Sequence, residues 1–153
     1  MPISETEFSV MMEDPDKWIR DDLRWREDPD HSPAFEFRVE VESRVGYPLL
    51  INGRFNRLAG TLSYTLIHRP TGRVYALDLG ADHHNPTCQR VGGEKHKHRW
   101  TDQHADKLAY VPTDITAAAD NPVEVWQQFC AEAKIVHNGR LDHPPVVQEE
   151  LPL

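Results

Sequence analysis

Side chains able to do chemistry are concentrated in residues 75–112 of this 153-residue chain. A loop in this stretch carries His84, and a later strand-like run carries His96 and His98. Because side chains alternate faces along a strand, His96 and His98 should point the same way about 7 Å apart, with Lys97 facing the other way. The sequence therefore predicts a histidine-centred site here.

One chemistry that fits this inventory is RNA cleavage without a metal. One imidazole would remove a proton from the attacking hydroxyl while another protonates the leaving group, and the ordinary imidazole pKa of about 6.5 suits both tasks. A lysine would stabilise the charge that develops on the phosphoryl oxygens. The predicted catalytic residues are His84, His96, His98, Lys107 and Asp78.

A metal centre is the second reading of the same residues. Neutral imidazoles bind zinc and other divalent transition metals, and carboxylates complete such shells. The predicted ligands are His84, His96 and His98, with zinc as the first metal to test. The spacing is a weak signal, because zinc signatures pair doublets of ligands and Cys88 has no second cysteine nearby.

The third reading is a binding module without catalysis, so the sequence leaves open whether this is an enzyme. The histidines would then hydrogen-bond to acidic residues such as Asp78, or hold a metal, and so order a long loop. The partner would be another protein or a nucleic acid. Two enzyme classes lack their signatures, since the chain has neither a phosphate-binding glycine loop nor a Gly-x-Ser-x-Gly elbow.

The net charge of −8 argues against a dedicated nucleic-acid binder, but the charge is unevenly distributed. Residues 43–99 carry 9 lysines and arginines against 3 acidic residues, whereas both flanking parts are acidic. This basic block could face phosphates, with the acidic N-terminal part masking it, or it could be ordinary clustering of surface charge. An acidic arm that mimics nucleic acid is a further possibility.

Targeting signals and disulfide patterns are both missing from the sequence. The first residues lack a signal-peptide pattern, and no run approaches the roughly 18 apolar residues that cross a bilayer. We therefore expect a cytoplasmic protein without a membrane partner. Cys88 and Cys130 have no framework spacing and are predicted to be thiols. The oligomeric state has no signature in the sequence.

Alternation of apolar and polar residues predicts most of the sheet. Asn52-Gly53 predicts a turn after a short apolar run. The strands are expected over 35–42, 58–68, 73–79, 96–100 and 108–111.

Helical signals are found near both ends of the chain. Asp120-Asn121-Pro122 predicts the start of an amphipathic helix that Asn138-Gly139 ends, and 16–26 predicts a short helix that buries Trp18. The fold class is therefore α+β, an antiparallel sheet of about five strands with one C-terminal helix packed on it. The expected organisation is an acidic N-terminal arm (1–33), a single α+β domain (34–140) and a proline-rich tail (141–153).

A series of motifs in this chain resembles a family of small uncharacterised bacterial proteins. The motifs are Tyr75-Ala-Leu-Asp-Leu-Gly80, His84-Asn-Pro86, His96-x-His98-x-Trp100 and Asp106-Lys107-Leu-Ala109, followed by one helix. In that family Trp is favoured at the position of Leu108, and members are similar to components of toxin–antitoxin-type gene pairs. The resemblance covers about two-fifths of the chain. It implies that the histidines matter and that a cognate antitoxin-like protein is a partner.

Overall fold

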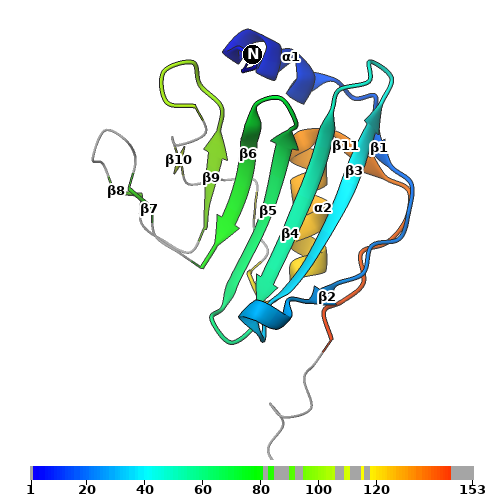
Figure 1. The fold of residues 1–153 in the computed structure, drawn as a ribbon, viewed down its shortest axis with the longest axis vertical. Helices are drawn as coiled ribbons and strands as arrows, with labels where there is room; N and C mark the ends of the chain where they lie inside the picture. Colours follow the sequence, from blue (N-terminus) through cyan, green and yellow to red (C-terminus); the bar gives the residue numbers. More distant parts are fainter. Residues whose placement is uncertain are drawn as a thin grey trace, which may run out of the picture.

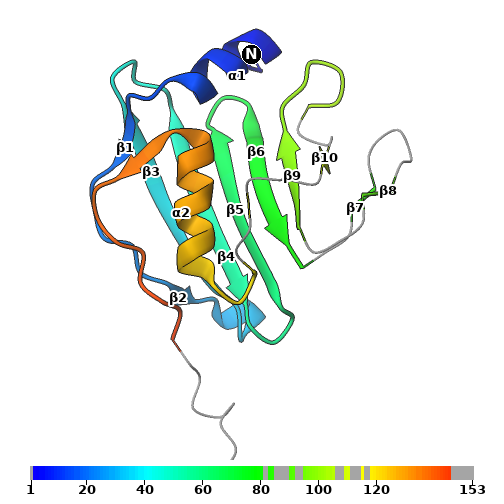
Figure 2. The same ribbon diagram turned by 180° about the vertical axis from the view of Figure 1, so that it is seen from behind.

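The computed structural model describes residues 2–80, 83–84, 90–91, 95–105, 109–110, 115 and 118–145, with 83–84, 90–91, 95–96 and 109–110 described by their backbone alone. In this part of the chain a large sheet carries one long helix across one face, and no helix covers the opposite face (Figures 1 and 2). We call the uncovered side the open face. The fold is therefore α+β, as predicted.

The centre of the sheet is an antiparallel meander of four strands: β3 (Phe35–Ser43), β4 (Leu49–Asn56), β5 (Thr61–His68) and β6 (Gly72–Leu79). Phe37, Tyr64 and Leu77 are buried on the helix side, because every second residue points there. Polar residues such as Asn52 and Thr65 lie on the open face, together with the buried apolar side chains of Leu50 and Ala76. The strands predicted over 35–42, 58–68 and 73–79 correspond to β3, β5 and β6, whereas β4 was not predicted as a strand.

Gly53 lies in the middle of β4, so the predicted turn at Asn52-Gly53 is wrong. It pairs with Phe37, whose ring lies over the glycine, and a Cβ built on Gly53 would lie 2.2 Å from that ring. Trp25 then packs edge-on against Phe37 with the ring centroids 4.9 Å apart. A glycine is needed here because an aromatic ring occupies the space of its side chain.

Helix α2 (Pro122–Ala133) begins where the capping signal predicts. The Asn121 side chain accepts a hydrogen bond from the Glu124 backbone N–H, and Pro122 occupies the first turn. The helix ends at Lys134 in a left-handed conformation, before the predicted stop at Asn138-Gly139. The chain turns there into strand β11 (Ile135–His137), which pairs with the sheet.

Helix α2 lies across the sheet (Figure 2), and aromatic contacts on its buried side fix it there. Trp126 packs against Tyr64 with the ring centroids 5.1 Å apart, and Phe129 stacks on Tyr75 at 5.6 Å. The Tyr64 hydroxyl donates a 2.6 Å hydrogen bond to the Pro122 carbonyl. These contacts bury large apolar surfaces and hold the helix in one register over β5 and β6.

The N-terminal segment contains helix α1 (Glu5–Glu13) and the strands β1 (Lys17–Ile19) and β2 (Arg26–Glu27). The predicted helix over 16–26 is therefore wrong: β1 enters the sheet between β3 and β11, and β2 pairs with β3. Trp25 is buried, whereas Trp18, which the predicted helix was expected to bury, is only partly buried. Sheet pairing outweighs the weak helical pattern here.

The remaining elements are η1 (Pro29–His31), β7 (His83–His84), β8 (Arg90–Val91), β9 (Lys95–Arg99) and β10 (Ala109–Tyr110). β9 and β10 confirm two predicted strands. Within the described residues the main sheet has nine strands, more than the predicted five, and β11 runs parallel to β1 in an otherwise antiparallel sheet. No helix among these residues is long and apolar enough to span a membrane.

Candidate functional site

Two of the predicted site residues, Asp78 and His98, meet at the β6–β9 edge of the described sheet. Nε2 of His98 lies 3.0 Å from a carboxylate oxygen of Asp78, and the His98 side chain is only 3 % exposed. In the strand register Asp78 is opposite His96, so it reaches His98 diagonally. Such a buried pair orders the sheet edge, and only Asp78 has appreciable contact with solvent.

Lys97 points to the other face of β9, as alternation predicts. Its Nζ lies 3.1 Å from a carboxylate oxygen of Glu132 on α2, and its side chain is fully buried. The ammonium also lies 5.8 Å from the centre of the Tyr75 ring. A buried lysine needs such partners, and here they join β9 to the helix.

The other predicted site residues are placed only in part. His84 and His96 lie in β7 and β9 with their backbones described, and Lys107 is outside the described residues. Among the side chains that the structure describes, no group of three or more histidines, cysteines and acidic residues could hold a metal. The metal site at His84, His96 and His98 therefore stays a prediction.

A second polar arrangement lies on the open face, where β2, β3 and β4 are adjacent. In the strand register Arg26 lies opposite Glu36, which lies opposite Arg54 on the next strand, and Arg38 lies opposite Asn52 one row away. Their side chains surround a hollow of about 270 Å³. We call it the arginine hollow; it is lined by Arg26, Glu36, Phe37, Arg38, Asn52, Gly53 and Arg54.

One arginine of the hollow is fixed and two are free. Nη1 of Arg54 lies 3.1 Å from Asp28 and 3.5 Å from Glu36. Burial of Asp28 opposes its ionisation, but hydrogen bonds from Arg54 and His31 outweigh burial and lower the pKa of this carboxyl. In the described part of the chain no acidic group pairs with Arg26 or Arg38, and both are exposed.

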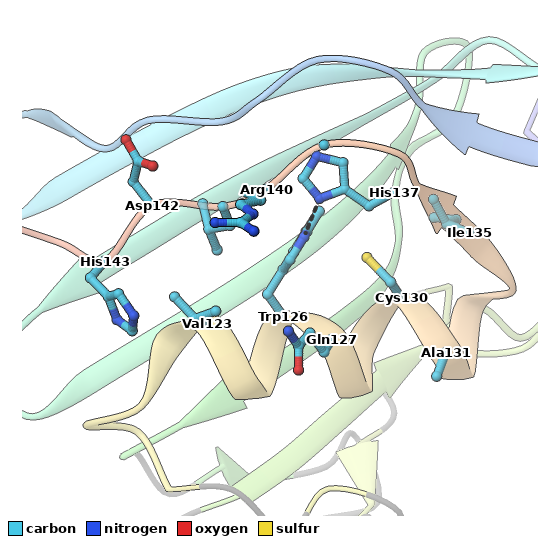
Figure 3. Close-up of a pocket in the computed structure, with 12 residues that line it drawn as sticks. Val123, Trp126, Gln127, Cys130, Ala131, Ile135, His137, Arg140, Asp142 and His143 are labelled. Carbon is cyan, nitrogen blue, oxygen red and sulfur yellow. Dashed lines mark hydrogen bonds between the residues drawn. The ribbon is translucent and has the colours of Figure 1, made fainter.

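A pocket of about 710 Å³ lies between α2 and residues 135–143 (Figure 3). Trp126 forms part of its wall and donates a 3.0 Å hydrogen bond from Nε1 to Nδ1 of His137. Nε2 of His137 lies 2.8 Å from the Asp21 carbonyl, so this nitrogen carries the proton and the imidazole is neutral. His137 is therefore a structural part of the pocket wall.

Cys130 lines the same pocket as a free thiol, as predicted. Burial raises the pKa of this thiol well above its ordinary range, because the thiolate would lose its hydration. A thiol in this state is a poor nucleophile. It contributes an apolar surface to the pocket.

Sequence reasoning missed both of these surfaces. Arg26 lies in the acidic N-terminal segment and Arg54 in the basic block, and only strand register shows that they flank Glu36. His137 has no motif around it, and its role depends on Trp126 from the helix and on Asp21 from the segment after β1. The alternating charges of β3 do indicate a polar face, which is the one available signal.

Comparison with known proteins gives one result. No curated protein and no solved structure matches the chain significantly. The model of a family of unknown function, DUF6978, matches residues 3–135. This range includes the meander, α2 and the residues that line the arginine hollow. This result agrees with the resemblance to an uncharacterised family and adds nothing about toxin–antitoxin pairs. The chain belongs to the family of unknown function DUF6978.

Proposed function

We propose that the protein is a non-catalytic binding module that holds single-stranded RNA by its phosphates on the open face. The observation that carries this proposal is the arginine hollow, in which Arg26 and Arg38 have no acidic partner among the described residues. A guanidinium presents several N–H donors in one plane and matches two oxygens of a phosphate. Two free guanidinium groups beside one hollow therefore suit a phosphodiester.

The neighbouring groups support the same ligand. Arg54 is held by Asp28, so its guanidinium keeps a fixed position at the rim of the hollow. The Asn52 amide adds an uncharged group able to donate, and the charged side chains of the lining, three arginines and Glu36, sum to +2. This positive charge lies within a protein of net charge −8, so it would attract a phosphate locally without making the whole surface sticky.

Burial of His98 is the reason to prefer binding over cleavage. A general acid or base must reach the reacting group within hydrogen-bond distance, and the His98 side chain is 3 % exposed with Nε2 beside Asp78. RNA cleavage by His84, His96, His98, Lys107 and Asp78 is the competing proposal. It requires this edge to open when RNA binds.

Fluorescence polarisation with a labelled single-stranded RNA of twelve nucleotides tests the proposal. Arg26→Gln/Arg38→Gln should weaken binding at least tenfold, and loss of two phosphate contacts should reduce the slope of log affinity against log salt by about 1.4. Arg44→Gln is the matched control, since Arg44 is an exposed arginine outside the hollow. Equal affinities for the two variants would rule out the arginine hollow as the RNA site.

Gel analysis of the same RNA separates binding from cleavage. Intact RNA after prolonged incubation agrees with a binding module. Cleavage that is lost in His98→Ala, with the melting temperature retained, would instead favour the RNA-cleaving enzyme. We propose a cytoplasmic location, where the RNA ligand would be available. The resemblance to toxin–antitoxin components adds the proposal that a cognate antitoxin-like protein covers the open face.

A further inference from the structure

We propose that the pocket between α2 and residues 135–143 is a separate site for a small amphipathic anion, an aromatic carboxylate or sulfonate. Its volume of about 710 Å³ falls in the range of small-molecule sites. The pocket lies on the helix side of the sheet, whereas the arginine hollow lies on the open face. This inference therefore does not depend on RNA binding.

The outer wall of the pocket is held in place by the N-terminal segment. Backbone hydrogen bonds join Asn138 to Ile19 at 2.9 Å, Leu23 to Arg140 at 2.7 Å and Asp142 to Leu23 at 2.9 Å. A Cβ on Gly139 would lie 2.7 Å from the Asp21 carbonyl oxygen, so the wall approaches this segment too closely for a side chain there. A wall fixed in this way needs little reorganisation to bind a ligand.

The pocket wall is mixed, with apolar side chains on both of its sides and polar groups among them. Helix α2 contributes one side and the segment after it contributes the other, through Val123, Trp126, Cys130, Ile135 and Leu141. His137 offers no free polar atom to a ligand, because both of its ring nitrogens are engaged by Trp126 and Asp21. An apolar ring or branched chain is the part of a ligand that this interior would accept.

The mouth of the pocket adds a positive charge. Within the described chain the Arg140 side chain has no acidic partner, while Asp142 lies 3.8 Å from Arg24. Figure 3 shows Arg140 on the segment opposite α2 and the Asp142 carboxylate pointing away from the helix. His143 lines the mouth near Val123. An anionic head group on an apolar body matches this arrangement.

Two fluorescent probes that share one aromatic skeleton test whether the positive charge of Arg140 contributes to binding. 8-Anilinonaphthalene-1-sulfonate carries a sulfonate, and N-phenyl-1-naphthylamine does not. The folded protein should bind one equivalent of the sulfonate probe, and Arg140→Gln should weaken that binding about tenfold while changing the neutral probe less than twofold. Gln127→Glu, which adds a negative charge at the exposed rim, should act in the same direction. Arg44→Gln should change neither probe.

Protection of Cys130 locates the bound probe without relying on a folding-sensitive variant. In a Cys88→Ser background, the buried Cys130 thiol should react slowly with 4,4′-dithiodipyridine, and a saturating concentration of the sulfonate probe should slow this reaction at least fivefold further. Equal losses of both probes in Arg140→Gln would contradict the role of the charge. An unchanged Cys130 rate at saturation, or no saturable binding by the folded protein, would overturn the proposal, whatever the RNA assay gives.

Discussion

Lys17 should make the stability of this protein rise with pH between pH 8 and pH 10.5. Its side chain is buried beneath α1, where Nζ donates hydrogen bonds to the carbonyls of Met11 at 2.5 Å and Met12 at 3.0 Å. These carbonyls lie at the end of the helix and need donors. Burial lowers the pKa of Lys17 from 10.5 to about 8, although Asp14 and Glu13 oppose the change.

The direction of this pH dependence follows from the number of protons bound by the folded and the unfolded chain. Between pH 8 and pH 10.5 the unfolded chain still protonates Lys17 while the folded protein does not, so the unfolded state binds more protons and the free energy of unfolding increases with pH. At about 1.36 kcal/mol for each pH unit, the gain is about 3 kcal/mol. The neutral amine keeps two N–H groups and can still donate to both carbonyls.

Urea denaturation of the wild type and of Lys17→Met, followed by tryptophan fluorescence between pH 7 and pH 10.5, measures this gain. Lys17→Met alone also changes the hydrogen bonds of α1, so the informative quantity is the difference between the two proteins as a function of pH. The Cys130 thiol has a raised pKa and makes both proteins less stable at high pH, and this contribution cancels in the difference. A difference that is constant with pH would refute the burial argument.

Three further substitutions test packing. Gly53→Ala should lower the free energy of unfolding by about 2–3 kcal/mol by displacing the Phe37 ring. Gly46→Ala has open space around it and should lower the free energy of unfolding by only about 1 kcal/mol, through its positive φ of +84°. Urea denaturation compares the two variants, and equal losses would contradict the close contact at Gly53. His98→Ala should lower the free energy of unfolding by about 2 kcal/mol, because a buried side chain and its contact with Asp78 are lost; an unchanged melting temperature in calorimetry would contradict this. Trp126→Phe should remove about 1–2 kcal/mol by leaving Nδ1 of His137 without a donor, and a loss that persists in a His137→Phe background would argue otherwise.

Local patterns predicted the elements that depend on local physics. The alternation in residues 35–42 predicts β3, since a half-buried strand needs this period whatever lies beside it. The Asn121 cap and Pro122 predict the start of α2 for the same reason. Alternation also placed Lys97 and His98 on opposite faces of β9.

Features that depend on distant partners were not predictable from pattern. β1 and β11 have three residues each, too few to show a period. β1 is a strand because β3 and β11 lie on its two sides, and β11 is a strand because β1 lies beside it. Burial of Lys97 runs against the usual exposure of lysine and depends on Glu132 in α2. The arginine hollow likewise requires the register of three strands.

The pairing of β1 with β11 has a consequence for synthesis on the ribosome. Lys17, Trp18 and Ile19 pair with Ile135, Val136 and His137, so the first strand of the sheet lies between β3 and a strand that is synthesised much later. The β3–β6 meander can form while later residues are still being added, because its contacts are close in sequence. The nascent chain should therefore expose the outer edge of β1 until residues 135–137 emerge, which makes that edge the place where a chaperone or a second nascent chain would act.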